Sequence, residues 1–503
     1  MNKKFILLLL LSAVLTTAKA SDLDTVSYAE HHSLWKMVLT ENLQNPAFMQ
    51  DAYRTSLSEF SIYMDYDHQD KALIHQDGSG YLLGGITAGT YLKMNDRTTV
   101  WGSASYRTGT KRHIWYNSTS DYDLLYPYVM GDTLGGNLKN EQYTFSGGCA
   151  TSFGNFTIGE TLDFRAEHEY RAEDPRPRGI VTDVNMAVGL GYRFLNYDIG
   201  AGVGGIFYKQ TTSVEFLKES GVIPEYHFTG LGTDYARFAG ANTSTYYKGT
   251  GIRTNISLRP VEGSGASLYA AYDYTPYKKI LSDINSFPLS TLYLENYQVE
   301  GGWKQQGNGF NWAALGGLNY QKRIGDEHIS GNSSSSEYDV IATMTMYHSH
   351  VADYYAGATV NWGNRNNWSL SGKTGYMDGA FEYVLPLRKM SYSKWFSQLD
   401  AQLISALSSH VILNLRLGAS LYHNLDNNIT MPYVNMDKNI TKLINDTYEN
   451  LTANYFKINP SVRIDVHPAS WKKMGFFASA DGFVTNTSHN DEYRMKLSMG
   501  VTF

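Results

Sequence analysis

The chain has 503 residues, of which 18% are charged, 14% are aromatic and 39 are tyrosine. The charged fraction is below the ~25% of ordinary soluble domains. A disordered chain is poor in aromatic residues, so the composition excludes that class. After residue 20 no run approaches the ~18 apolar residues of a membrane helix, and the net charge of −6 argues against nucleic acid as a partner.

Residues 1–20 have the three parts of a secretory signal. Two lysines precede an apolar run from Phe5 to Val14, and Ala18-Lys19-Ala20 is a small-residue cleavage site. We expect cleavage after this site, which removes three lysines and changes the net charge from −6 to −9. The alternative is an uncleaved anchor.

Residues 21–55 do not alternate and are expected to form a short segment ahead of the barrel. The pattern predicts a helix over Ser33–Leu43, which Asn45-Pro46 then ends because proline lacks an N–H. We expect this segment to plug the lumen. The alternative is a periplasmic tether or lid with no role in transport.

From about residue 56 to residue 503 the dominant period is two, which is typical of strands with one apolar and one polar face. In the window 456–467, for example, apolar side chains, Pro460 among them, alternate with polar ones at every step. We predict eighteen strands, with 16 or 20 as alternatives. They begin near residues 58, 80, 97, 141, 155, 180, 197, 246, 266, 290, 310, 351, 367, 391, 410, 454, 474 and 493.

Three features favour a transmembrane antiparallel β-barrel over a soluble β-sandwich. The alternating segments are longer than the ~5–6 residues of an average soluble strand. Tight turns alternate with long polar loops, expected at 114–140, 212–244, 324–338 and 424–452. Aromatic residues gather near strand ends, as in the girdles of outer-membrane barrels. We therefore expect the outer membrane as the location and its lipid as a partner, and we interpret Tyr338–Tyr347 as a strand extension above the membrane.

The last residues alternate from Tyr493 to a terminal aromatic, Phe503. This ending resembles the final strand of bacterial outer-membrane barrels, and the resemblance implies the barrel-assembly machinery as a partner. Asn45-Pro46-Ala47 resembles a motif of the fatty-acid-transporter superfamily of barrels, in which an N-terminal segment plugs the lumen. In overall style the chain is similar to uncharacterised outer-membrane barrel families of Bacteroidota, which implies a fold and a compartment more than an activity.

The polar face of the strands has charges of both signs. An ion-selective pore would favour one sign, so we expect these side chains to pair with each other and with a plug; structural ion pairs without a transport role are the alternative. The lumen-lining candidates are Arg107, Arg165, Asp183, Arg193, Arg253, Asp273, Asp400, Arg416, Arg463 and Asp465. Glycines such as Gly200 and Gly302 within strands indicate close approach by another segment.

No motif for catalysis is present, so we expect no enzyme activity and no cofactor. The single cysteine, Cys149, lies in the apolar register of its strand and is interpreted as a small hydrophobic residue. We expect no metal site. The nearest candidates are Asp65, Asp67 and His68 in the first predicted outer loop, and His348 and His350 on one strand face.

These patterns predict a passive channel, or the membrane subunit of an uptake system, for a small solute. The alternative is a surface-assembly or secretion partner that binds another protein through its long outer loops and does not transport.

Overall fold

The computed structural model describes residues 25–217, 225–238, 244–331, 338–363, 365–435, 438–468, 471, 474–488 and 490–503. The secretory signal expected at residues 1–20 lies outside these ranges. In the part of the chain that is described, no helix has both the length and the apolar character needed to cross a membrane.

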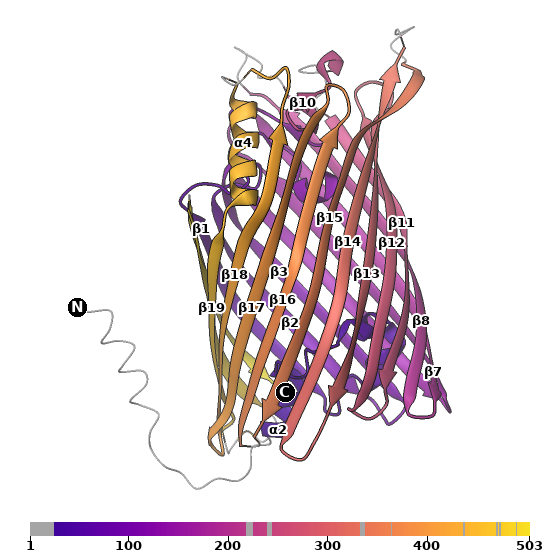
Figure 1. Ribbon diagram of the computed structural model, residues 1–503, viewed down its shortest axis with the longest axis vertical. Helices are drawn as coiled ribbons and strands as arrows, with labels where there is room; N and C mark the ends of the chain where they lie inside the picture. Colours follow the sequence, from indigo (N-terminus) through magenta and orange to yellow (C-terminus); the bar gives the residue numbers. More distant parts are fainter. Residues whose placement is uncertain are drawn as a thin grey trace, which may run out of the picture.

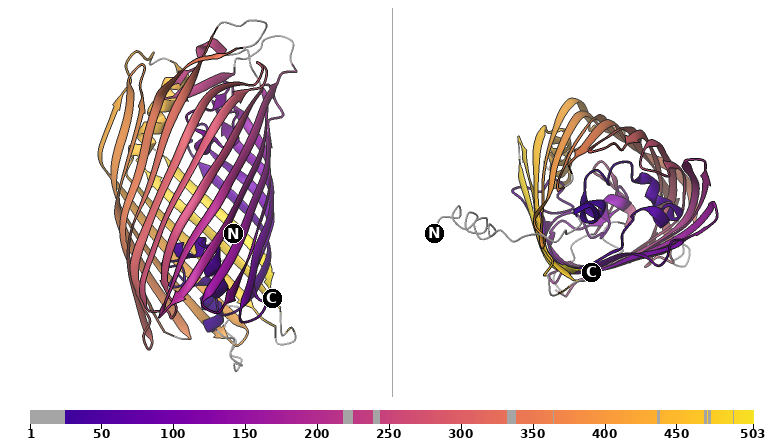
Figure 2. Two further views of the ribbon diagram at one scale, coloured as in Figure 1. Left: turned by 90° about the vertical axis from the view of Figure 1, so that its right-hand side faces the viewer. Right: turned by 90° about the horizontal axis from the view of Figure 1, so that it is seen from below.

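Eighteen antiparallel strands form one closed barrel, because the last strand pairs with the first (Figures 1 and 2). The predicted fold class and strand number are confirmed. The barrel strands are β1 (Leu57–Gln69), β2 (Gly80–Lys93), β3 (Thr98–Ile114), β5 (Gly136–Phe153), β6 (Phe156–Tyr170), β7 (Arg176–Phe194), β8 (Tyr197–Glu215), β11 (Ser244–Pro260), β12 (Gly265–Leu281), β13 (Phe287–Gln305), β14 (Phe310–Ser330), β15 (Val340–Trp362), β16 (Asn366–Tyr383), β17 (Arg388–Ser408), β18 (Val411–Thr430), β19 (Tyr455–Val466), β20 (Gly475–Thr487) and β21 (Asp491–Thr502).

The outer surface of the barrel is apolar. In β19, Phe456 and Val462 point outward and are 45% and 40% exposed, whereas Asp465 points inward and is 1% exposed. Aromatic side chains of neighbouring strands align in register, as at Tyr354 and Tyr376. Such a cylinder, with every barrel strand paired on both sides, leaves no open sheet edge in lipid. The protein is an outer-membrane β-barrel.

The two ends of the barrel differ. Short turns, such as residues 94–97 and 154–155, join strands at one end, which we call the turn end. The other end, which we call the loop end, carries the long connections. The predicted extension at Tyr338–Tyr347 is confirmed from Val340 onward, since β15 pairs with β14 there. The predicted loop 324–338 was too long, because β14 continues to Ser330 through the same pairing.

Long connections at the loop end fold into the mouth of the barrel. The connection after β3 carries α3 (Tyr122–Leu125) and β4 (Met130–Gly131), and the one after β8 carries β9 (Tyr226–Gly230), β10 (Thr233–Asp234) and η3 (Ala236–Phe238). Strands β4, β9 and β10 form a small second sheet. Helix α4 (Asn439–Thr452) follows β18 and stands at the loop end (Figure 1). We call α3, β4, β9 and β10 the lid.

The N-terminal segment is helical, but not over the predicted residues. It contains α2 (Thr25–His32), η1 (Glu41–Gln44) and η2 (Pro46–Asp51), and residues 34–39 form turns. The predicted helix at Ser33–Leu43 was wrong, because Leu39 has φ 59°, a left-handed conformation that an α-helix does not accept. Its predicted apolar side chains nevertheless pack together against Ala313 of the wall.

Candidate functional site

The N-terminal segment lies inside the barrel at the turn end (Figure 2, right). Polar wall side chains hold its backbone at several points. Gln402 accepts a hydrogen bond from the Leu34 amide at 2.7 Å and donates one to the His32 carbonyl at 2.9 Å. On β13, four strands away from Gln402 of β17, Lys304 donates to the Trp35 carbonyl at 2.9 Å. The segment is therefore bound to the inner wall across the lumen.

Asn45-Pro46-Ala47 sits against a glycine-lined part of the wall. Asn45 is 0% exposed, and its side chain accepts from the Ala47 amide at 3.0 Å and donates to the Leu190 carbonyl at 3.3 Å. A Cβ atom at Gly189 would collide with the Asn45 side chain, and one at Gly200 would approach it to 2.5 Å. Glycines in these strands thus permit the close approach. A Cβ atom at Gly302 would likewise approach the Leu39 side chain, to 3.0 Å. The predicted close approach of another segment at Gly200 and Gly302 is thus confirmed.

Charged wall residues also reach this segment. Arg193 donates to Asp198 at 2.9 Å and to Asp51 of η2 at 3.1 Å. Arg463 pairs with Asp465 at 2.8 Å, and the Asp465 carboxylate accepts from Tyr28 of α2 at 2.9 Å. Inward charges thus pair with each other and with the N-terminal segment.

The remaining lumen-lining candidates pair along the wall. Arg253 and Asp273 are 2.8 Å apart, and Arg416 and Asp400 are 2.9 Å apart. Arg107 lies 3.8 Å from Glu167.

Arg165 reaches beyond the wall. It lies 3.6 Å from Asp183 and also forms two hydrogen bonds, of 2.9 and 2.6 Å, with Asp121. Asp121 immediately precedes α3, so this pair connects the wall to the lid.

The lid is bound to the wall through a buried core and buried polar contacts. Leu125, Tyr128 and Val129 pack against tyrosines and leucines of the inner wall. Lys279, 1% exposed, donates to the Val129 carbonyl at 2.8 Å. Glu225, just before β9, accepts from Ser118 at 3.1 Å. Burial, together with the nearby Asp132 carboxylate, raises the pKa of Glu225 to about 8, so this side chain is largely neutral at pH 7.

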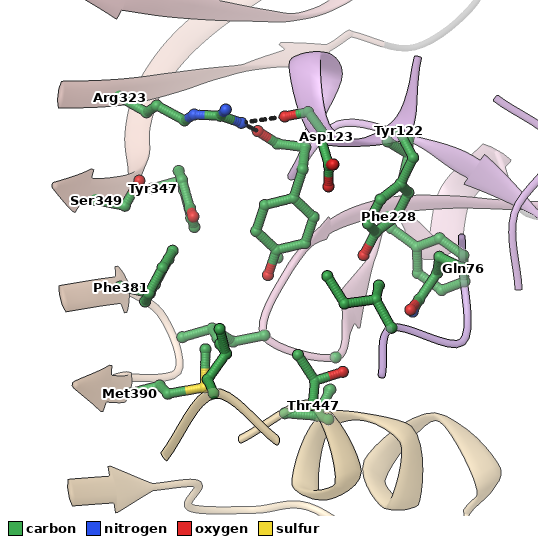
Figure 3. Close-up of a pocket in the computed structure, with 18 of the residues that line it drawn as sticks. Gln76, Tyr122, Asp123, Phe228, Arg323, Tyr347, Ser349, Phe381, Met390 and Thr447 are labelled. Carbon is green, nitrogen blue, oxygen red and sulfur yellow. Dashed lines mark hydrogen bonds between the residues drawn. The ribbon is translucent and has the colours of Figure 1, made fainter. Parts of the chain in front are cut away.

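A cavity of about 270 Å³ lies between the lid, α4 and the wall (Figure 3). This volume is at the small end of the ~300–1,000 Å³ typical of ligand sites. Its lining is mainly apolar and aromatic and comes from the lid, from α4 and from strands β14 to β17. The aromatic side chains are Tyr116, Tyr122, Tyr126, Phe228, Tyr347 and Phe381.

One arginine and one aspartate also line the cavity. Arg323 of β14 donates through Nη1 to the backbone carbonyls of Asp123 at 2.6 Å and Tyr126 at 2.8 Å, and through Nε to Gln321 at 3.0 Å (Figure 3). The guanidinium therefore fixes the α3 backbone and leaves the Asp123 carboxylate free of that interaction. Burial raises the pKa of Asp123, and the Arg323 and Lys111 charges oppose the rise.

Asp77 lies in the connection between β1 and β2, next to Gln76 of the cavity lining. Its side chain keeps access to solvent, although protein surrounds it on most sides. Burial, and then the Asp123 carboxylate, raise the pKa of Asp77 to about 7. The Asp77 carboxyl group is thus ionised in about half of the molecules near neutral pH.

The structure separates the candidate metal ligands. Asp65, Asp67 and His68 belong to β1 and not to a loop, so alternation sends His68 to the opposite face. Asp65 forms two hydrogen bonds with Arg494, one of them at 2.8 Å.

The histidine pair of β15 does not gather a third ligand. His350 lies 3.2 Å from Asp378, whereas His348 stands opposite Ile324 and Glu382. Across the described ranges, no group of three or more His, Cys, Asp or Glu side chains is placed to hold a metal ion.

The sequence pattern missed Asp123 and Arg323. They lie in loops or at the loop-end part of a strand, where alternation gives no information. The one available signal was the number of aromatic residues in the connection 115–135, which is unusual for a solvated loop.

The pattern of the "Family of unknown function (DUF6850)" matches residues 46–503. A comparison with curated proteins gives no match. Among solved structures, a mutant of the ferric enterobactin receptor from Pseudomonas aeruginosa is 7% identical, with 89% of this chain and 80% of that chain covered and a TM-score of 0.38. The outer membrane transporter YddB from Escherichia coli is 10% identical, with 88% and 80% covered and a TM-score of 0.37. The CymD monoaromatic hydrocarbon channel is 10% identical, with 93% of each chain covered and a TM-score of 0.32.

Proposed function

The chain belongs to the family of unknown function DUF6850, and we propose that it transports a small solute across the outer membrane. The solute binds first in the cavity at the loop end and then passes down the lumen. The observation that carries the proposal is the cavity itself: an apolar, aromatic space of about 270 Å³ between the lid and the wall, at the mouth of a transmembrane barrel.

Passage requires movement at both ends. The lid fills part of the mouth, and residues 25–56 are bound across the turn end by the contacts at Gln402, Lys304 and Arg193. These contacts are hydrogen bonds and ion pairs between polar groups, which water replaces at small net cost. We therefore propose that the N-terminal segment acts as a plug whose displacement opens the lumen, as an uptake subunit or a gated passive channel requires.

The resemblance of Asn45-Pro46-Ala47 to a motif of the fatty-acid-transporter superfamily supports the same role for this segment. We also propose that the protein comes from the Bacteroidota and is exported through the signal at residues 1–20. We propose further that the barrel-assembly machinery recognises Phe503 and that the protein is not an enzyme.

The alternative function is a surface partner that binds another protein through its outer loops. The exposed part of α4 and the connection around it favour this function. Against it, the connection after β8 turns inward: Leu231 is 2% exposed and packs in a cluster with Tyr347 and Met390. Less of the loops is thus available for a partner than their length suggests.

Single-channel conductance and liposome swelling of the purified full chain test the proposal. We expect small, intermittent conductance for the natural protein, and steady conductance once residues 25–50 are deleted. A barrel that stays closed after the deletion and purifies from native membranes with a fixed protein partner would overturn transport in favour of the surface-partner function.

A further inference from the structure

We propose that the cavity at the loop end selects a small organic cation: an amine or quaternary ammonium group attached to an apolar or aromatic body. The inference concerns binding and rests on the proposed function only in taking this cavity as the solute's first site.

The aromatic walls fit such a ligand. Six rings surround the cavity, three from the lid connection (Tyr116, Tyr122 and Tyr126) and three from β9, β15 and β16 (Phe228, Tyr347 and Phe381). The face of an aromatic ring is negative and attracts a cation within about 6 Å of its centre. The same rings pack well against an apolar body. A cluster of this kind therefore accepts a ligand that combines both properties.

The charges of the cavity discriminate between ligand classes. Asp123 lines the cavity, and its carboxylate has no hydrogen bond or ion pair with any residue in the described ranges. Asp77 lies close enough for the two carboxylates to influence each other. Two carboxylates against the one arginine of the lining leave a net negative charge beside the cavity, which repels an anion and attracts a cation.

The neighbouring cations are already engaged. Arg323 uses Nη1 and Nε for the two backbone carbonyls and Gln321. Lys111 is 2.5 Å from the Glu169 carboxylate and is therefore neutralised by it. Arg323 keeps its positive charge, because its partners are neutral, and it balances one of the two carboxylates. Positive charge that balances the second carboxylate is thus best supplied by the ligand.

Calorimetry on the detergent-solubilised full chain tests this selection with three probes of similar shape: 2-phenylethylammonium, 2-phenylethanol and phenylacetate. We expect the cation to bind at least about tenfold more tightly than the neutral alcohol, and phenylacetate to bind weakest. Equal affinity for the cation and the alcohol, tighter binding of phenylacetate, or no binding of any probe would each overturn the inference.

Asp123→Asn removes the charge at nearly constant shape and should abolish the preference for the cation. Phe381→Leu removes one ring but keeps an apolar wall, so it should weaken the binding of the cation more than the binding of the alcohol. Asp70→Asn is the matched control, because Asp70 is an exposed acid of the same connection as Asp77 and does not line the cavity. A folded band on unheated gels that shifts on boiling confirms that each variant keeps the barrel.

Binding and transport can fail separately. Selective cation binding without flux would overturn the proposed function and leave this inference intact. Flux of the neutral alcohol without any preference for binding the cation would overturn this inference and leave the proposed function intact.

Discussion

Arg165 of the barrel wall and Asp121 of the lid connection form a two-fold hydrogen-bonded ion pair, with Nη–Oδ distances of 2.9 and 2.6 Å. The same carboxylate accepts from Tyr208 at 2.8 Å. This pair connects β6 to the segment that carries α3, and α3 in turn presents Tyr122 and Asp123 to the cavity. The position of the lid, and thus the shape of the cavity, depends on it.

Arg165→Ala should therefore loosen the lid. It leaves the half-buried Asp121 carboxylate without its main partner, which costs about 3 kcal/mol for a buried pair. We expect faster proteolysis within residues 115–135 and weaker binding of 2-phenylethylammonium. Arg416→Ala breaks a similar pair, with Asp400, that does not touch the lid. Equal proteolysis of both variants would show that the pair does not position the lid.

Gly189→Val should displace the N-terminal segment. A Cβ atom at this position collides with the Asn45 side chain and approaches Pro46 to 2.9 Å, so Asn45-Pro46-Ala47 can no longer seat against β7. We expect conductance in planar bilayers to rise toward that of the variant lacking residues 25–50. Gly89→Ala is the control, since a Cβ atom there has no neighbour within 4 Å. Unchanged conductance of Gly189→Val would refute the plug role.

Cation binding should weaken as the pH falls. The pKa of Asp77 is about 7 and that of Asp123 is raised from its ordinary value, so both carboxylates gain protons as the medium becomes acidic. A protonated carboxyl group no longer attracts a cation, and the affinity for 2-phenylethylammonium should drop about tenfold from about pH 8 to about pH 6.

The charges facing these two groups are those of Lys111 and Glu169 for Asp77, and of Arg323 and Lys111 for Asp123. Titrations of the Asp77→Asn variant provide the comparison: its affinity should be lower at high pH and vary less with pH. A natural protein whose affinity rises on acidification would contradict the expectation.

Glu160 should reduce the stability of the barrel in lipid. On the described strands, between the aromatic girdles, the register places only this charged side chain on the outward face, beside Ile158 and Leu162. Its one hydrogen-bond donor is Cys149, at 3.5 Å. Glu160→Leu should raise the free energy of unfolding in liposomes by roughly 1–2 kcal/mol, because a carboxylate in the lipid band is unfavourable.

The urea or guanidinium midpoint in lipid vesicles measures this change. Thr161→Val is its control, since the side chain of Thr161 points to the lumen and not to lipid. If Glu160→Leu lowers the midpoint, the carboxylate has a partner or a role in the membrane that its surroundings do not reveal.

Much of the wall was predictable because its pattern is local. Alternation identified which side chains face lipid and which face the lumen, and eighteen strands followed from the spacing of turns. The charged candidates pair as expected, for example Arg253 with Asp273, because cross-strand neighbours are set by register alone. The predicted helix at Ser33–Leu43 was wrong because side chains of separate wall strands, such as Gln402 and Lys304, bind the backbone of this segment. Periodicity does not encode such contacts.

The amino-acid sequence by itself determined the compartment and the barrel. Each strand faces lipid on one side and the polar lumen on the other, so alternate residues must be apolar and polar. Only the tertiary structure decided what occupies the cylinder. Asn45 lies between strand glycines, and Asp123 and Arg323 meet at an aromatic cavity, so both sites join segments far apart in the chain. Such contacts depend on how the closed barrel brings its connections together, and no local pattern specifies them.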